Sequence, residues 1–409
     1  MATIEKINDG YFFLTKEACE ALPKYKYKGE DRSLLYIYVL SPLAAFLVNT
    51  ATPRWLAPNA ITLIGLVWMG VAYATIWYYV PTLEIEDSDS VPRWIFLLNF
   101  VSMLVYQTLD NMDGKQARRT GSSSPLGMLF DHGCDAINAI AGSANWIMTL
   151  GLNPDKDALL CWAIVLGPMS MFFIATWEEF YTGALILPII NGVSEGLVGG
   201  ALLSLATYLY GVEFWQDTHF YNTVVSNFLP GFVRDQWIAP EGLRNADLQV
   251  MLALFFIVRE YIDRSIVISY KFGLQTLWNQ IAFLVLASTT LAVGVADRNV
   301  WLRMPRTSLH LSSVLFVDLV TQLMLDHLTK QPYNPFRWIQ APMVGLTLLV
   351  AAGMVEASST TDSFLLAYTT GLWVYQLLKI RIVIHEACAV LGIWCFNITT
   401  PRTTSKKLQ

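Results

Sequence analysis

The sequence is poor in charged residues and lacks the composition of a soluble protein. Only 14% of its 409 residues are charged and 54% are hydrophobic, whereas soluble chains carry about 25% charged residues. Apolar runs of roughly 17–25 residues, the length that crosses a bilayer, recur along most of the chain. We find no soluble domain and no low-complexity linker. The composition therefore excludes the two or three soluble domains that the length alone would suggest.

Cysteine is scarce, and its five copies have neither CxxC nor Cys/His metal spacing. Most of them lie in or beside apolar runs, so we interpret them as small buried residues. The first thirty residues lack an uninterrupted apolar core, and no cleaved signal peptide is predicted. The net charge of −5 is spread over many loops and predicts no nucleic-acid partner.

The apolar runs predict an all-α polytopic membrane protein with about ten transmembrane helices. Residues 34–50 are apolar but short and contain Pro42, so they predict an additional N-terminal interfacial or tilted helix. An even number of spans puts both termini on the same side. The predicted spans are 60–81, 94–110, a third from about Leu126, 157–176, 195–211, 248–265, 278–296, 308–327, 341–359 and 363–385.

Charge in the loops predicts the orientation of these spans. The predicted loop 111–127 carries Lys115, Arg118 and Arg119, so the positive-inside rule places it, and both termini, in the cytosol. The acidic loop 84–90 then lies on the opposite side. One group of residues departs from this bias, because it falls in a lumenal loop: Arg298, Arg303 and Arg306.

The most informative stretch is 110–135, DNMDGKQARRTGSSSPLGMLFDHGCD. Asp110 and Asp113 are three residues apart, and Asp131 and Asp135 are four apart. On helices these spacings place each pair on one face, where the side chains can converge. Carboxylates next to membrane spans are costly and usually mark a functional site.

Four converging carboxylates predict a site for hard divalent cations. They would repel one another strongly unless cations neutralised them, and oxygen ligands suit Mg²⁺ or Mn²⁺ rather than zinc. Two such ions roughly 3.5–4 Å apart serve in-line displacement at phosphorus. Gly114 and Gly127 allow close backbone approach, and Lys115 and Arg118 can hold phosphate oxygens. Two other interpretations are helix capping or pairing with the nearby cations, and an ion relay in a transporter.

The spacing of this stretch resembles the signature of the CDP-alcohol phosphotransferases, with every fixed position filled. The flanking KQARRT and LFDHGCD resemble the eukaryotic choline/ethanolamine phosphotransferase branch more narrowly. Further similarity extends to 58–66, 177–183, 191–196 and 327–330. The matching positions are Asp110-x2-Asp113-Gly114-x2-Ala117-Arg118-x8-Gly127-x3-Asp131-x3-Asp135.

The resemblance implies a membrane enzyme of the endoplasmic reticulum or Golgi that is a homodimer. Such enzymes transfer phosphocholine or phosphoethanolamine from CDP-choline or CDP-ethanolamine to diacylglycerol or alkyl-acylglycerol, release CMP, and need Mg²⁺ or Mn²⁺, here two ions. The implied metal ligands are Asp110, Asp113, Asp131 and Asp135. The implied CDP pocket is lined by Gly114, Ala117, Arg118 and Gly127, with Asn59 nearby.

A base must take the proton of the lipid hydroxyl as it attacks the β-phosphorus. His132 is the first candidate, because imidazole titrates near physiological pH and lies beside two predicted metal ligands. Asp135 is the alternative. Relatives usually carry a glutamate where this chain has Met128, so we hypothesise that Glu178 or Glu179 supplies the missing carboxylate. The aromatic run 177–181, in a predicted loop, can hold a quaternary ammonium or anchor the chain at the interface.

These observations divide the chain into four predicted segments. Two alternatives to the leading function remain: the same chemistry with another alcohol acceptor, and a membrane transporter or inactive scaffold. The residues do not separate choline from ethanolamine. Lys406 and Lys407 resemble a dilysine retrieval signal of the endoplasmic reticulum, or only make the tail soluble. The segments are a cytosolic N-terminal segment with the interfacial helix (1–57), the catalytic helical domain (58–265), C-terminal transmembrane helices with a possible role in dimerisation (266–396), and a cytosolic tail (397–409).

Overall fold

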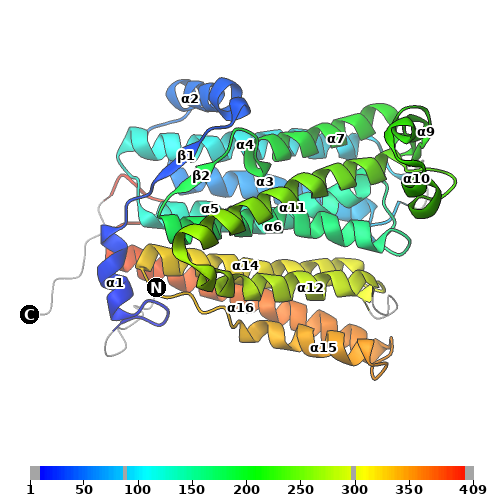
Figure 1. Ribbon diagram of the computed structural model, residues 1–409. Coiled ribbons are helices and arrows are strands. Elements are labelled where there is room, and N and C mark those ends of the chain that lie inside the picture. The colour runs from blue at the N-terminus through cyan, green and yellow to red at the C-terminus, as the bar shows by residue number, and fades with distance from the viewer. Residues whose placement is uncertain (1–9, 86–89, 296–300, 401–409) are drawn as a thin grey trace, which may run out of the picture.

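The long helices of the protein run side by side in one bundle (Figure 1). The computed structural model describes residues 10–85, 90–295 and 301–400. The predicted helical class is confirmed, apart from one pair of three-residue strands. The longer helices are α3 (Pro58–Tyr79), α4 (Trp94–Thr120), α5 (Pro125–Thr149), α6 (Ala158–Thr182), α7 (Leu197–Tyr210), α11 (Asn245–Phe272), α12 (Ile281–Val295), α14 (Pro305–Thr329), α15 (Ala341–Ala351) and α16 (Ser359–Leu391).

Each of the ten predicted spans overlaps one of these helices. Within the described residues, four helical stretches are both long and apolar enough to cross a membrane: 58–79, 158–182, 192–210 and 305–329. The α15 helix has 11 residues and ends at Ala351, well before the predicted 359 and short of the ~20 residues that a span needs. A membrane protein is therefore supported, whereas the number of ten crossings stays a prediction.

The α4 helix is longer than predicted, so part of the segment between the two aspartate pairs is helix instead of loop. The sequence predicts a loop over 111–127, but α4 continues to Thr120. Gly121 ends it with a left-handed φ of 67°, a conformation that glycine adopts without strain. Ser124 then accepts a hydrogen bond from Gly127 N–H and caps α5. The loop prediction is wrong because charged residues continue a helix when its end emerges into water.

The N-terminal part of the chain lies across one end of the bundle. It forms α1 (Lys16–Ala21), a short turn, the strand β1 (Gly29–Asp31) and α2 (Ser41–Thr50). The β1 strand pairs in parallel with β2 (Leu185–Leu187), with Gly29 opposite Leu185, a pairing that the sequence did not predict. In Figure 1, α2 lies on the outside of the bundle, where it packs on α4, and its Phe46 is 63% exposed. A position of this helix at the membrane interface stays a prediction.

The predicted loop 212–247 contains short helices at the opposite end of the bundle, where Figure 1 shows α9 and α10. These elements are α8 (Glu213–Gln216), α9 (His219–Thr223) and α10 (Gly231–Trp237).

Two of the arginines that the sequence places in a lumenal loop, Arg303 and Arg306, interact with other groups of the protein. Arg306 is 4% exposed, and its guanidinium donates hydrogen bonds to the carbonyls of Val80 and Pro81 at the end of α3. Arg303 pairs with Asp362 at 3.0 Å. Each of these two guanidinium groups therefore has a partner within the protein. Arg298 lies outside the described residues.

The α14 helix forms the centre of the bundle. It packs against α5, α6, α12 and α16, and 83% of its most apolar stretch is buried inside the protein. The predicted domain boundary at 265/266 falls inside α11, which is continuous from Asn245 to Phe272. The C-terminal helices thus pack directly on the helices that carry the aspartate pattern.

Candidate active site

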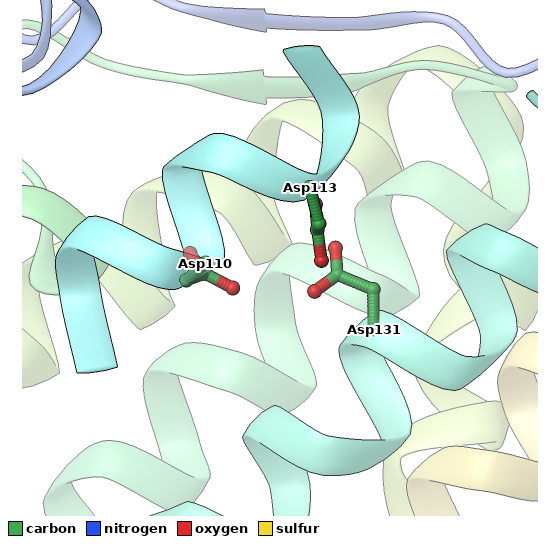
Figure 2. A group of neighbouring side chains, drawn as sticks. All are labelled: Asp110, Asp113 and Asp131. Atoms are coloured by element: carbon green, nitrogen blue, oxygen red, sulfur yellow. The ribbon is translucent and has the colours of Figure 1, made fainter. Parts of the chain in front are cut away.

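The four aspartates lie on two helices joined by a short turn. Asp110 and Asp113 are near the end of α4, and Asp131 and Asp135 are in the first turns of α5. Figure 2 shows the carboxylates of Asp110, Asp113 and Asp131 pointing toward one another between the two helices. One carboxylate oxygen from each of these three residues lies within 4.8 Å of the others. The convergence that the spacing predicts is confirmed for these three.

Hydrogen bonds fix two carboxylates and leave a third with an unused oxygen. The Thr62 hydroxyl, on α3, donates to Asp113, and the Tyr106 hydroxyl donates to Asp135. Asp131 Oδ1 is buried and has no hydrogen-bond partner among the residues that the structure describes. A buried carboxylate oxygen without a partner is costly, and among acidic neighbours a cation is the group that satisfies it. The donor set therefore fits a hard divalent ion.

Asp135 stands apart from this group of three. Its carboxylate accepts the hydrogen bond of Tyr106, and it is not among the three residues whose oxygens converge. It does line the same cavity. The geometry accounts for one ion, while a second ion that uses Asp135 stays a prediction.

The aspartates open into a large cavity of about 1120 Å³. All four aspartates and His132 line it. A volume of this size is at the upper end of small-molecule sites, which span roughly 300–1,000 Å³, and can hold a nucleotide together with part of a lipid. The predicted substrate-binding residues that line it are Asn59, Gly114, Ala117, Arg118 and Gly127.

Lys115 is the predicted substrate-binding residue that does not line the cavity. Its ammonium donates a 2.8 Å hydrogen bond to the Ser41 hydroxyl and lies 5.8 Å from the centre of the Tyr36 ring. The side chain therefore holds α2 against α4. Three positions further on, Arg118 does line the cavity, because its α-carbon is on the adjacent face of α4.

The protein itself leaves room for a side chain at two glycines of the signature, Gly114 and Gly127. A Cβ built on Gly114 would lie 3.5 Å from Arg118 Nη1, and one on Gly127 would lie 3.6 Å from Ser124 Oγ. These are ordinary contact distances. Any requirement for glycine at these two positions must come from a molecule in the cavity.

His132 projects into the cavity from α5 between two aromatic rings. Its ring centre is 6.4 Å from that of Tyr27 and 6.3 Å from that of Phe172. Its Nε2 lies 4.0 Å from Asp131 Oδ2. The low-polarity surroundings raise the pKa of the Tyr27 phenol, and the negative charges of Glu179 and Asp131 raise it further. The phenol therefore stays protonated.

The carboxylates proposed to replace the missing glutamate are engaged elsewhere. Glu178 pairs with Arg264. Glu179 accepts a hydrogen bond from the Tyr25 hydroxyl at 3.4 Å and lies 3.8 Å from His327 Nε2. Across the described ranges, neither glutamate forms a hydrogen bond or ion pair with His132.

Met128, at the position where the resemblance implies a glutamate, has a packing role. It is 8% exposed and belongs to a buried apolar cluster that includes Leu14 and Leu22 of the N-terminal segment. A charged side chain there would oppose this packing.

The aromatic run 177–181 is not a loop, because α6 continues to Thr182. Trp177 is fully buried, and its Nε1 donates to the Thr276 carbonyl at 3.3 Å. The Tyr181 hydroxyl accepts a bond from Asn279. Neither ring lines the cavity. The aromatic residues that do line it are Tyr25, Tyr27, Tyr36, Phe172 and Trp394.

Sequence reasoning missed two segments of the cavity wall, one from each end of the described chain. Residues 25–31 line it from the N-terminal side, and residues 392–395 with 397–400 line it from the C-terminal side. Asn59 Nδ2 donates to the Cys395 carbonyl at 3.1 Å. The alternating lysines and tyrosines of 24–28 are the local sequence signal for this part of the wall.

The fold and the site together define a class: a membrane-associated helical enzyme whose clustered carboxylates can hold a metal ion. Comparison with known proteins makes this assignment specific. Residues 55–193 match the family model of the CDP-alcohol phosphatidyltransferases, a range that contains all four aspartates. The resemblance deduced from the spacing is thereby confirmed.

Some relatives match over nearly the whole chain and others over about half of it. Choline/ethanolaminephosphotransferase 1 of Arabidopsis thaliana is 32% identical, over 93% of this chain and 96% of its own length. An uncharacterized class-I family protein of Dictyostelium discoideum is 29% identical, over 94% and 98%. Choline/ethanolaminephosphotransferase 1 of Saccharomyces cerevisiae is 33% identical over 53% of each chain. The protein belongs to the CDP-alcohol phosphatidyltransferase family and is a transferase of phospholipid synthesis.

Proposed function

We propose that the protein transfers phosphoethanolamine, phosphocholine or both from the CDP-alcohol to diacylglycerol or alkyl-acylglycerol. The products are the corresponding phospholipid and CMP. The observation that carries the proposal is the three-carboxylate cluster in a cavity large enough for a nucleotide. We take the two head groups from the names of two Arabidopsis relatives, which match this chain over 96% of their own length.

The donor is bound by its diphosphate and nucleotide. Arg118 supplies a guanidinium, which suits phosphate oxygens in a bidentate geometry. The open space beside Gly114 and Gly127 lets the donor approach the backbone of both helices. Ala117 and Asn59 complete this side of the cavity. Lys115 is removed from the predicted binding set, because its ammonium bonds to Ser41.

Asp110, Asp113 and Asp131 fit Mg²⁺ or Mn²⁺, as their oxygen donors and the unsatisfied Asp131 Oδ1 indicate. A bound ion supplies neutralisation of the diphosphate and polarisation of its phosphorus. Two ions, with Asp135 as a ligand of the second, extend the same proposal. Until cations are present, the carboxylates repel the diphosphate as well as one another.

His132 is the proposed general base. The lipid hydroxyl forms the new O–P bond at the β-phosphorus while its proton passes to an imidazole nitrogen. The bond between that phosphorus and the CMP oxygen breaks, and CMP leaves with its own phosphate. Asp131 Oδ2, 4.0 Å from His132 Nε2, stabilises the imidazolium that forms. Asp135 is the less favoured base, because its carboxylate already accepts a hydrogen bond from the Tyr106 hydroxyl.

We further propose that the cavity faces the cytosol from an endoplasmic-reticulum or Golgi membrane. The end of the bundle that holds the cavity also carries Lys115, Arg118 and Arg119, as the positive-inside rule expects. Ten crossings and a homodimer formed through residues 266–396 belong to the same proposal. The tail residues Lys406 and Lys407, which would act as a retrieval signal, lie outside the described residues.

Purified protein tests the proposal directly. The protein is reconstituted with diacylglycerol and Mn²⁺ or Mg²⁺, and CMP release is measured with CDP-choline and CDP-ethanolamine in parallel. Release with at least one donor, abolished by chelator, is expected. Absence of release with both donors refutes the proposal, and the ratio of the two rates assigns the head group.

A further inference from the structure

The N-terminal segment is held by a carboxylate from α16, far along the chain. Glu386 is fully buried. Its Oε1 accepts hydrogen bonds from the backbone N–H of Phe12 (2.9 Å) and Phe13 (3.3 Å), and its Oε2 from Phe13 (3.1 Å) and Leu14 (3.0 Å). Hydrogen bonds to an ionised acceptor are about twice as strong as neutral ones. One side chain thus fixes the path of three consecutive residues.

The segment then passes through an apolar contact before it reaches the cavity. Leu14, Ala18 and Leu22 are each at most 3% exposed. They belong to one buried cluster with residues of α5, α14 and α16, namely Leu126, Met128, Leu325, Leu328, Val383, Ala387 and Cys388. This packing fixes the chain between the residues bound by Glu386 and residues 25–31.

A second anchor holds the other end of this segment. Asp31 Oδ2 accepts a bond from the Ser194 hydroxyl at 2.7 Å, and Asp31 Oδ1 accepts the Ser33 N–H at 2.8 Å. Glu195 accepts the Ser33 hydroxyl at 2.5 Å. Between the two anchors, residues 25–31 line the cavity. We call residues 25–31 the roof segment.

We propose that Glu386 is a positioning residue that holds the roof segment over the donor site. The inference rests on the proposed function, because the donor is the CDP-alcohol. The roof segment brings Tyr27 beside His132 and places Lys26 and Lys28 at the cavity, where their charges favour a diphosphate. We call the hydrogen bonds from Glu386 to residues 12–14 the clamp. If the clamp is lost, only a fraction of the molecules has the roof segment in place, and the affinity for the donor falls by that fraction.

The test uses full-length protein with Glu386→Gln, which keeps the size of the side chain but turns an amide N–H toward the backbone donors. Glu20→Gln, an exposed acid on α1, is the matched control. Hydrogen exchange is measured at residues 12–14, and initial rates are measured against donor concentration. Donor affinity is also measured without turnover, from the CDP-choline and CDP-ethanolamine concentrations that protect residues 25–31 from exchange.

We expect amides 12–14 of Glu386→Gln to exchange at least about tenfold faster, and the donor KM to rise about tenfold with kcat within about twofold. The control should match the wild type. Unchanged exchange at 12–14 overturns the clamp. Faster exchange with unchanged donor affinity overturns the positioning role, as does faster exchange throughout the bundle with an equal loss in kcat. If the wild type neither turns over nor is protected by either donor, the proposed function and the positioning role fail together, and exchange at 12–14 still decides the clamp.

Discussion

Replacing Asp131 by asparagine should abolish transfer without unfolding the protein. Asp131 joins α5 to the two acids of α4, since oxygens of all three lie within 4.8 Å. Its Oδ1 is buried and has no hydrogen-bond partner within the described part of the chain, so the substitution removes a ligand of the proposed ion. A metal at phosphorus supplies several kcal/mol of charge stabilisation, and a loss of about 4 kcal/mol lowers kcat about 10³-fold.

The same substitution should have the opposite effect on the metal-free protein. With chelator present, three clustered carboxylates repel one another. Asparagine removes one charge, and its amide can donate to Asp110 or Asp113. We therefore expect the free energy of unfolding of Asp131→Asn in chelator to equal or exceed that of the wild type.

Added Mn²⁺ separates the two proteins. At a concentration a hundred times Kd, a bound ion stabilises the wild type by about 2.7 kcal/mol, and the variant should gain far less. CMP release and thermal unfolding, each with chelator and with Mn²⁺, measure both effects. Asp235→Asn, an exposed acid paired with Arg234 on α10, is the control. A variant that keeps its turnover, or one that is destabilised in chelator, would show that Asp131 is not a metal ligand.

Three further substitutions test other parts of the site. His132→Ala should lower kcat by about 10²- to 10⁴-fold with little change in donor KM, because it removes proton transfer; an unchanged kcat would assign the base elsewhere. Lys115→Ala should leave donor KM nearly unchanged, since its ammonium bonds to Ser41, whereas Arg118→Ala should raise it; equal effects in steady-state assays would contradict this contrast. Trp177→Ala should destabilise the protein by about 3–5 kcal/mol in thermal unfolding. It should leave the ratio of choline to ethanolamine turnover unchanged, and a changed ratio would show that Trp177 contributes to head-group binding.

Sequence reasoning succeeded where the deciding interaction is local. The spacing of Asp110 and Asp113 along one helix predicts their common direction, and the helical hairpin then brings Asp131 to meet them. Apolar runs of helical length likewise predicted every long helix, because the period and length of a helix are written in consecutive residues.

It failed where distant parts of the chain meet. The roof segment depends on a carboxylate at Glu386, more than 300 positions later in the sequence, and no local pattern reports such a contact. Arg306 looked like a lumenal loop charge until its contacts with the end of α3 were known. Lys115 was assigned by charge alone, although direction around α4 decides whether it reaches the cavity.

The position of α14 also bears on how the chain is assembled during synthesis. It packs directly on α5 and α6, yet it is translated more than 120 residues after α6 ends. The nascent α5–α6 surface must therefore remain in the bilayer without its permanent partner until Pro305–Thr329 arrives. The aspartate hairpin therefore acquires its final packing late, and a chain arrested before residue 305 should expose the faces of α5 and α6 that α14 covers.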